Sequence, residues 1–348
     1  MNTVVFAHTK EKLPQNGLLP NKKELFSKLM DRDIRPVVSY TAENAFTDSG
    51  VEVSELVSEE MTQSVGHIAL DEVGVIVNRL DRSFKEDLMP DAWNESRIPI
   101  SNENTMRALV YRKHRVQNEV LDPLGLGMPS LLVDSALAAA LFMQEHPVDH
   151  YIVKPTSGTF SKGVERLAKD DVLAYVSASQ KVGSIIIQPA FDFTHPFPAS
   201  MKPFDTASKD DFETWAQSNV TKELRMYGFY DGNKTNVFPV GRAMKDGQDH
   251  WFFIDPETVP DKLTNDTERV ISRAAHLTGS RAVYAALDIG YGNARSNEAP
   301  DYHVVELNGR MPYMIGYDKH AGVADILRDT YADQLQIVAN QTASRKVE

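Results

Sequence analysis

Residues 151–167, YIVKPTSGTFSKGVERL, place the strongest local constraint on how this chain folds. An apolar, strand-like run ends at Lys154 and Pro155, and small and hydroxyl-bearing residues then lead into a second strand-like run. A glycine-rich loop between two strands exposes backbone N–H groups, which are the donors that a polyphosphate needs. We therefore predict a hairpin that covers phosphates, with the Lys154 ammonium group reaching the same ligand. The loop residues expected to contact phosphate are Gly158, Thr159, Ser161 and Gly163.

This loop differs from a P-loop, because Gly163 is followed by Val164 and Glu165 and not by a Lys-Ser or Lys-Thr pair that opens a helix. A hairpin flap fits the pattern better. The alternative is an ordinary surface hairpin, in which the stem of Lys154 lies along apolar surface and its charge reaches water.

The composition of the 348 residues excludes several classes of function. A net charge of −12 disfavours binding to a nucleic-acid backbone, and the absence of cysteine excludes disulfides, thiolate catalysis and cysteine metal sites. The first residues lack the apolar core of a signal peptide, and no window approaches the roughly 18 apolar residues of a membrane span. We expect a soluble, cytoplasmic protein of two or three lobes that binds neither nucleic acid nor membrane.

The first part of the chain alternates strand-like and helix-like patterns. Apolar runs occur at residues 3–8, 36–40 and 74–80, and a helical pattern capped by Asn21 separates the first two. This βαβ-type order predicts a small parallel sheet, and we expect the domain that contains it to span residues 1–104.

Arg79 and Arg82 follow the third of these strands, at the edge where ligands of open α/β sheets commonly bind. Their guanidinium groups would suit a substrate carboxylate, and surface salt bridges are the alternative.

The rest of the chain divides into two further lobes. Residues 105–191 predict a central lobe, with a helical stretch at 105–121, the glycine loop, and a final apolar strand, SIIIQPAF. Residues 192–348 predict a mainly antiparallel lobe, because Asp-Gly pairs typical of tight hairpin turns separate its strand-like runs. The three segments together indicate an α/β fold of the mixed α+β kind. Residues 191–222 fit none of the expected elements.

A long helix is expected inside the third segment. Asn265 and Glu268 have the spacing of a capping box, and Gly279 is typical of the residue that ends a helix. Two more strands and a closing helix from about Val323 complete the segment.

The stretch HVVELNGRMP contains a candidate metal site. Side chains alternate along a strand, so Glu306 and Asn308 lie on one face of it. Asp288 is an acid in an otherwise apolar strand, where its charge needs a cation or hydrogen-bond donors. Carboxylate and amide oxygens are suited to Mg²⁺. The alternative for Glu306 and Asn308 is that they lie on a solvated strand face. The alternative for Asp288 is that it is an acid at the end of its strand.

Three arginines add positive charge to the same lobe: Arg225, Arg242 and Arg310. Guanidinium groups bind phosphate and carboxylate through two parallel hydrogen bonds. Surface ion pairs are the alternative for each of them.

Taken in order, these segments resemble the ATP-grasp superfamily, and especially its carboxylate–amine ligase branch, which includes glutathione synthetase and the peptide glutamate ligases. The resemblance runs over residues 104–339. It implies an ATP-grasp fold, with an N-terminal parallel-sheet domain, a central lobe that carries a glycine-rich flap, and an antiparallel C-terminal lobe with a metal site.

The resemblance also implies roles for the nucleotide-binding residues. Lys113 matches the lysine of the family's Asp-Lys pair, although Arg112 replaces the aspartate and Arg115 is close enough to leave the assignment open. Lys154 matches the second nucleotide lysine. The strand SIIIQPAF is similar to the strand whose backbone faces adenine, near Gln188 and Ala190, and many relatives carry Glu where Gln188 stands.

For the reacting end of the site, Arg225 matches an arginine that faces the phosphate and acyl groups. Arg310 matches the arginine of the family's final motif, and the implied metal ligands are Asp288, Glu306 and Asn308. The implied cofactors are ATP and Mg²⁺, with Mn²⁺ as an alternative. His320 and Arg242 are further candidates for contact with substrate, and a helix-capping or solvent-facing role is the alternative for His320.

The resemblance implies an ATP-dependent ligase that joins a carboxylate to an amine through an acyl phosphate. The expected substrates are a small-molecule carboxylate and an amine, with an amino acid or a peptide as candidates, and a homo-oligomer is one candidate assembly. A phosphotransferase or a ligase that acts on another acceptor is one alternative, since ATP motifs do not identify the acceptor. A non-catalytic ATP-binding module is the other.

Overall fold

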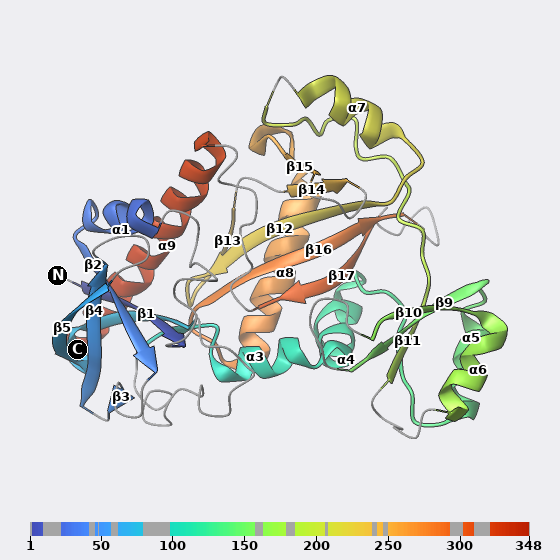
Figure 1. Cartoon of the computed structure of the whole chain (residues 1–348), viewed down its shortest axis with the longest axis horizontal. Helices are drawn as coiled ribbons and strands as arrows, with labels where there is room; N and C mark the ends of the chain where they lie inside the picture. Colours follow the sequence, from blue (N-terminus) through green and yellow to red (C-terminus); the bar gives the residue numbers. More distant parts are fainter. Residues whose placement is uncertain are drawn as a thin grey trace.

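A computed structural model of the protein describes residues 2–9, 22–41, 46–47, 49–56, 62–78, 98–156, 163–178, 185–205, 208–238, 242–245, 250–292, 302–309 and 321–347. Three sheets follow one another along the long axis of the molecule, as Figure 1 shows. The last sheet in the sequence lies in the middle, between the N-terminal sheet and the central-lobe sheet. Within the described ranges, no helix is long and apolar enough to cross a bilayer.

The N-terminal sheet contains the predicted parallel strands. Its parallel part has the order β2-β1-β6-β7, and α1 lies between the first two strands of the sequence. Three antiparallel strands that the sequence analysis missed extend the sheet beyond β2. The alternation of apolar and polar residues in GVEVSEL is the signal that would have identified one of them, and its Val51 and Val53 are buried in the structure. The elements are β1 (Asn2–Thr9), α1 (Lys22–Met30), β2 (Ile34–Thr41), β3 (Phe46–Thr47), β4 (Gly50–Leu56), β5 (Thr62–Ala69), the 3₁₀ turn Leu70–Glu72, β6 (Val73–Asn78) and β7 (Ile100–Ser101).

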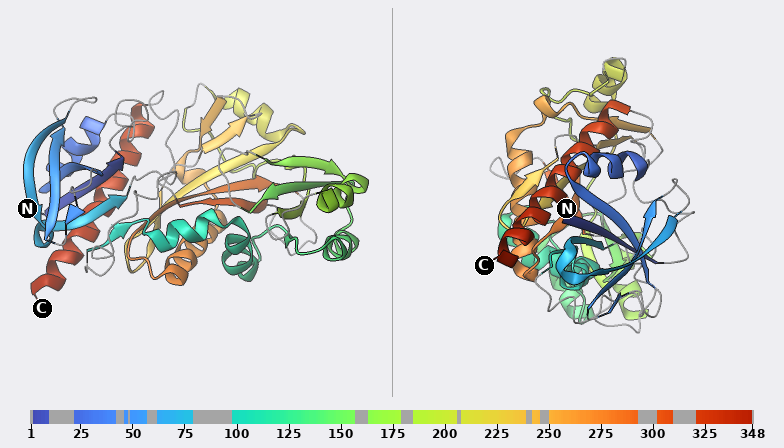
Figure 2. Two further views of the ribbon diagram at one scale, coloured as in Figure 1. Left: turned by 60° about the horizontal axis from the view of Figure 1, so that its bottom comes forward. Right: turned by 90° about the vertical axis from the view of Figure 1, so that its left-hand side faces the viewer.

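The C-terminal helix α9 (Ala321–Val347) returns to this first sheet. It packs against α1, β1 and β6, as the right-hand view of Figure 2 shows. Charge pairs add to the apolar contact, since Lys28 donates to Asp329 at 2.7 Å and Arg32 donates to Asp333 at 2.7 Å. The helix predicted at the end of the segment 192–348 therefore lies in a core shared by the N-terminal and middle sheets, since its Tyr331 ring also packs on Phe229 and Tyr284. The predicted domain boundaries remain predictions.

Asn102 joins the N-terminal sheet to the middle sheet. It has a left-handed backbone (φ 59°), which asparagine tolerates better than most residues. Its side chain donates to the Tyr284 carbonyl and accepts from the Tyr284 N–H, both at 2.8 Å. Ser101 also forms a parallel bridge with Ala282. These bonds fix the position of one sheet relative to the other.

The helix predicted over 105–121 is broken at Arg112, whose backbone leaves the helical region (φ −92°, ψ 83°). A π-helix, Val116–Leu121, follows the break. The central-lobe sheet is antiparallel, with the order β10-β9-β11-β8, and α5 and α6 pack against each other beside it. The elements are α3 (Asn104–Tyr111), α4 (Lys113–Arg115), the 3₁₀ turn Asp122–Leu124, β8 (Leu131–Leu132), α5 (Ala136–Glu145), β9 (His150–Pro155), β10 (Glu165–Ala168), α6 (Lys169–Ala178) and β11 (Ile185–Pro189).

The middle sheet is antiparallel, as predicted, with the order β15-β14-β12-β16-β17 and β13 beside β12. Helix α8 begins at Asp261, so the predicted capping box at Asn265 is wrong; the N-cap is Pro260, five residues earlier. Gly279 ends α8 in the left-handed conformation (φ 66°), as predicted. The elements are β12 (Lys222–Tyr230), β13 (Thr235–Val237), β14 (Arg242–Lys245), β15 (His250–Phe253), the 3₁₀ turn Pro256–Thr258, α8 (Asp261–Thr278), β16 (Val283–Tyr291) and β17 (Tyr302–Asn308).

Residues 191–222, which the sequence left unassigned, form a segment that includes α7 (Lys209–Gln217). Its aromatic rings pack onto the middle sheet, and Trp215 stacks on Phe252 with ring centroids 5.3 Å apart. Lys222 is fully buried and donates to the carbonyls of Ser218, Val220 and Thr194. The buried ammonium group therefore ties both ends of the segment to the start of β12.

Candidate active site

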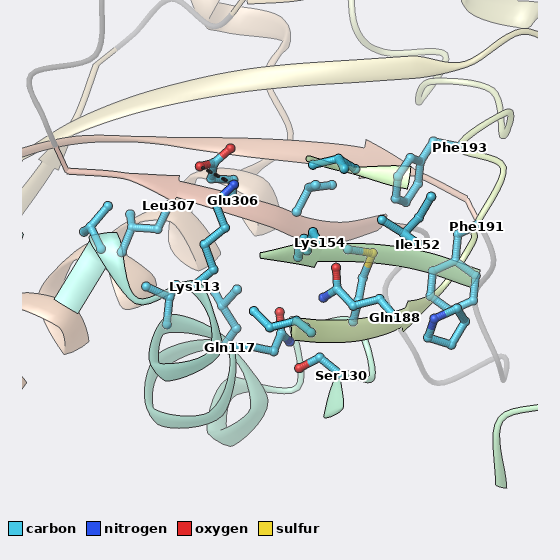
Figure 3. A pocket seen from close by; sticks show the side chains of 18 residues that line it. Lys113, Gln117, Ser130, Ile152, Lys154, Gln188, Phe191, Phe193, Glu306 and Leu307 are labelled. Carbon is cyan, nitrogen blue, oxygen red and sulfur yellow. Dashed lines mark ion pairs between the residues drawn. The ribbon is translucent and has the colours of Figure 1, made fainter. Parts of the chain in front are cut away.

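A cavity of about 220 Å³ lies between the central-lobe sheet and β17. Figure 3 shows charged side chains at one end of it and an amide and two aromatic rings toward the other. Its side walls are apolar, which suits a flat ring system whose polar edge meets a few fixed groups. Its lining residues include Lys113, Val116, Gln117, Leu121, Ile152, Lys154, Gln188, Phe191, Phe193, Val305, Glu306 and Leu307.

Lys113 is the member of the basic trio 112, 113 and 115 that lines the cavity. Its ammonium group lies 3.5 Å from a Glu306 oxygen (Figure 3), and its backbone N–H donates to the Thr156 carbonyl just beyond β9. Arg115 instead makes two hydrogen bonds to Glu119, at 2.6 and 2.7 Å. The break in the helix at Arg112 turns Lys113 toward the flap strand.

Lys154 ends β9 and lines the same part of the cavity. Burial, reinforced by the nearby charge of Lys113, lowers the pKa of Lys154 to about 8, although Glu306 acts in the opposite direction. Two cations held close together in a partly dry cavity are unfavourable on their own. An anionic ligand would relieve that cost.

The predicted acidic cluster lies on one face of the middle sheet, beside the lysines. Asp288 on β16 is directly opposite Glu306 on β17 and directly opposite Arg225 on β12. Asn308 donates to Asp288 at 2.8 Å, so all four side chains face the same way. The register shifts just after the Asp288–Glu306 pair, and such bulges often direct side chains at sites.

Arg225 and Asp288 form a two-pronged ion pair, with Nη2 donating to Oδ2 at 2.7 Å and Nε donating to Oδ1. Burial alone would lower the pKa of Arg225, but the charge and hydrogen bonds of Asp288 raise it above its ordinary value. The guanidinium group is therefore a permanent positive charge next to the acids.

Glu223 is a residue that the sequence analysis did not select. It lies two residues before Arg225 on the same strand face, and burial, then the charge of Asp288, raises the pKa of its carboxyl group. The available signal was local, because an acid lies two residues before the selected arginine in the stretch Glu223-Leu224-Arg225.

The three predicted metal ligands fit a hard cation by their chemistry, because two carboxylates and an amide share one face of the middle sheet next to two lysines. Among the described residues, no three His, Cys, Asp or Glu side chains gather as a metal site on their own. The set therefore depends on Asn308 and on ligands that a nucleotide would bring.

At the other end of the cavity, Gln188 is buried and lines the wall. The Ala190 N–H, which was expected to face the base, donates to the His150 carbonyl at 2.9 Å and so extends the pairing of β11 with β9. That N–H is unavailable to a ligand in this conformation, because it is already in the sheet.

Phe191 and Phe193 also line this end, and sequence reasoning missed them. Phe191 stacks on His303, with centroids 5.4 Å apart. The Phe193 ring lies against Gly290, where an added Cβ would be 2.5 Å from Cδ1 of the ring. Gly290 therefore allows Phe193 to lie against the sheet and form the wall.

We expect Gly290→Ala to lower the free energy of unfolding by about 2 kcal/mol, because the new methyl group overpacks against Phe193. Urea unfolding measures this loss. Adding Phe193→Ala should recover most of the stability by removing the ring. A double variant as unstable as the single one would show that the clash with Phe193 is not the cause.

Several predicted residues lie outside the described ranges: Arg79, Arg82, Gly158, Thr159, Ser161, Arg310 and His320. Gly163 is exposed and left-handed (φ 74°), in a turn two residues before β10. Arg242 lies in β14, opposite Arg225 in the strand register.

Neither a protein-family model nor a curated protein matches the chain. Solved structures do match it. The ATP-grasp ligase PsnB, complexed with minimal precursor, Mg and ADP, has a TM-score of 0.56 at 16% identity, over 97% of this chain and 97% of that chain. A RiPP-associated ATP-grasp ligase from Chryseobacterium gregarium, with ADP and a leader and core peptide, has a TM-score of 0.53 at 12% identity, over 99% and 97% of the two chains. The D-alanine-D-alanine ligase from Coxiella burnetii has a TM-score of 0.54 at 8% identity, over 99% and 97%. By this likeness, the chain has the fold of the ATP-grasp ligases.

Proposed function

We propose that this chain is an ATP-dependent ligase that joins a carboxylate to an amine. One observation carries the proposal: the charged end of an apolar-walled cavity, with Lys113, Lys154 and Glu306, adjoins the cluster of Asp288, Asn308 and Arg225. The cations that would bind phosphate and the candidate metal ligands therefore lie together, at the end of the cavity where the phosphates of a bound nucleotide would lie. The structural neighbours named above, ligases whose structures contain ADP and peptides, support the proposal.

In the proposed reaction, a substrate carboxylate oxygen attacks the γ-phosphorus of ATP, and the bond from that phosphorus to the ADP oxygen breaks. The amine nitrogen then attacks the acyl phosphate carbonyl; the C–O bond to phosphate breaks, and the nitrogen loses a proton. This chemistry needs mainly positioning and charge neutralisation, so no protein nucleophile is required.

The chain's own residues would supply that positioning. Lys113 and Lys154 would bind the phosphates, and the permanent charge of Arg225 would face the transferring group. Arg310 is proposed to assist on the basis of the sequence resemblance. The residues that would hold Mg²⁺, with Mn²⁺ as the alternative, are Asp288, Glu306 and Asn308; the bound ion would neutralise phosphate charge.

The low pKa of Lys154 gives a prediction about pH. A bound phosphate favours the charged ammonium group, so nucleotide binding should take up a proton when the solution pH is above the free pKa of about 8. The affinity for ATP should therefore fall about tenfold between pH 7.5 and pH 9. Calorimetry in buffers of different ionisation enthalpy measures both the affinity and the proton uptake.

Lys154→Arg is the matched control, because arginine stays charged over this range. Its ATP affinity should be nearly independent of pH from 7.5 to 9. If the variant shows the same decline as the unmodified protein, another group causes it.

Phosphate release with ATP and Mg²⁺, in pools of amino acids, short peptides and small carboxylic acids, tests the activity. Masses are then read from each active pool. A condensation mass would establish the ligase and begin to identify both substrates. A phosphorylated product without an amide would favour a phosphotransferase, and ATP binding without turnover in any pool would favour a non-catalytic module.

A further inference from the structure

A second, open groove lies on α8, outside the cavity described above, with a volume of about 450 Å³. Its basic residues are spaced i, i+4 and i+7 along α8, which places them on one side of the helix. The chain has a net charge of −12, so a groove lined by basic residues has the opposite sign to the protein as a whole. Its lining residues are Leu124, Arg269, Ser272, Arg273, His276 and Leu277.

The groove contains cationic donors that the fold does not use. Arg273 donates through Nε to the Glu119 carbonyl at 2.7 Å, and its two Nη atoms donate to no described residue. Arg269, half-exposed, uses Nη1 on Asp266 at 2.7 Å and has its remaining nitrogens without a partner among the described residues. The His276 ring touches the Tyr230 ring edge-on, and its nitrogens make no hydrogen bond within the described ranges.

The single bond to Glu119 matters because it fixes the plane of the Arg273 guanidinium group. A fixed fork binds an oxyanion with less loss of freedom than a mobile one. Leu124 and the exposed Leu277 flank the cations and offer apolar contact. We propose that this groove binds a small organic anion, a phosphate or carboxylate attached to an apolar body.

The groove is also connected to the cavity. Glu119 belongs to the π-helix Val116–Leu121, and its carbonyl is one of the last in that helix, where an outside donor is needed. Three residues of the same short helix, Val116, Gln117 and Leu121, line the cavity. An anion on the Nη atoms of Arg273 would hold its Nε against this carbonyl and so stabilise the cavity wall.

Occupancy of the groove should therefore strengthen nucleotide binding by about fivefold, at the low end of usual coupling between two sites. This coupling rests on the proposed function, whereas the affinity of the groove for anions does not. The two parts can be measured separately.

Calorimetry with phenyl phosphate tests the groove. The double variant Arg269→Gln/His276→Gln removes one guanidinium group and one imidazole ring from the groove and leaves the bond from Arg273 to Glu119. It should bind phenyl phosphate at least about tenfold more weakly than the unmodified protein. Arg35→Gln, which removes an arginine from the exposed ion pair with Glu55 on the N-terminal sheet, is the control and should bind normally.

The proposal is overturned if phenyl phosphate binds equally well to the groove variant and its binding is abolished by Lys154→Met. That result would place the ligand in the cavity. If inorganic phosphate binds as tightly as phenyl phosphate, the phenyl ring contributes nothing to binding, and the proposed apolar contact is overturned. Benzoate, with the same ring, distinguishes a carboxylate from a phosphate as the anionic group; failure of both to bind would overturn the site.

A fluorescent ATP analogue then tests the coupling, with and without saturating phenyl phosphate. The unmodified protein should bind the analogue about fivefold more tightly with phenyl phosphate present, and the groove variant should show no change. An unchanged affinity in the unmodified protein would overturn the coupling. Failure to bind the analogue at all would overturn the proposed function, while calorimetry would still report on the groove.

Discussion

Glu306→Gln is expected to lower the rate of phosphate release by roughly a thousandfold, the upper end of what one electrostatic group supplies in a preorganised site. Glu306 lies between the candidate phosphate-binding lysines and the candidate metal ligands. Its carboxylate is 3.5 Å from the Lys113 ammonium group, and it is directly opposite Asp288 in the sheet. Glutamine keeps the shape and removes the charge. The substitution should therefore remove reactivity without removing the cavity.

The fold of this variant should be nearly unchanged, because the Glu306 side chain is 38% exposed and its pair with Lys113 is partly solvated. Thermal unfolding checks this, and binding of the fluorescent ATP analogue checks that the cavity remains. Glu257→Gln, at an exposed acid on the 3₁₀ turn before α8, is the matched control and should keep full activity. An unchanged rate in Glu306→Gln would remove Glu306 from the proposed machinery.

Asp288→Asn is expected to reduce both stability and activity. The Asp288 carboxylate accepts hydrogen bonds from Arg225 and Asn308, so its loss leaves a largely buried guanidinium group without its counter-charge. The side chains of Asp288 and Arg225 are 17% and 24% exposed, so this ion pair is not fully buried. We therefore expect a loss of about 2 kcal/mol in the free energy of unfolding, which is less than the loss on breaking a fully buried pair. Phosphate release should fall about a hundredfold.

The double variant Arg225→Gln/Asp288→Asn separates the two effects. Two neutral amides can hydrogen-bond to each other, so urea unfolding should recover most of the lost stability. Phosphate release should stay low, because neither the charge toward the phosphates nor the candidate metal ligand is restored. Recovery of turnover together with stability would show that this pair acts only in folding.

The sequence predicted the elements of the site where the local pattern was strong. Strands β9, β12, β16 and β17 are largely apolar runs that contain a few polar residues, and side chains alternate between the two faces of a strand in any surroundings. For this reason Arg225, Asp288, Glu306 and Asn308 could be expected on strand faces. Gly279 likewise ends α8 through its own backbone freedom.

The helix break at Arg112 had no such local signal. The residues around it are compatible with a continuous helix, and only the packing of the central lobe turns Lys113 toward Glu306. Phe193 was missed for a related reason, since its place in the wall depends on Gly290, about a hundred residues later in the chain, which offers no Cβ to exclude the ring.

By itself, the sequence determined many short-range features of this protein: the strands of the candidate site, which of their residues alternate onto one face, and the position of Lys154 near the end of a strand before the predicted flap. Those follow from steric and hydrogen-bonding rules within a few residues. Only the tertiary structure decided the pairing of Asp288 with both Arg225 and Asn308, the return of α9 to the first sheet, and the alignment of Arg273 with Glu119. These contacts join residues 20 or more positions apart, and their energies depend on burial and geometry that exist only after the chain has folded.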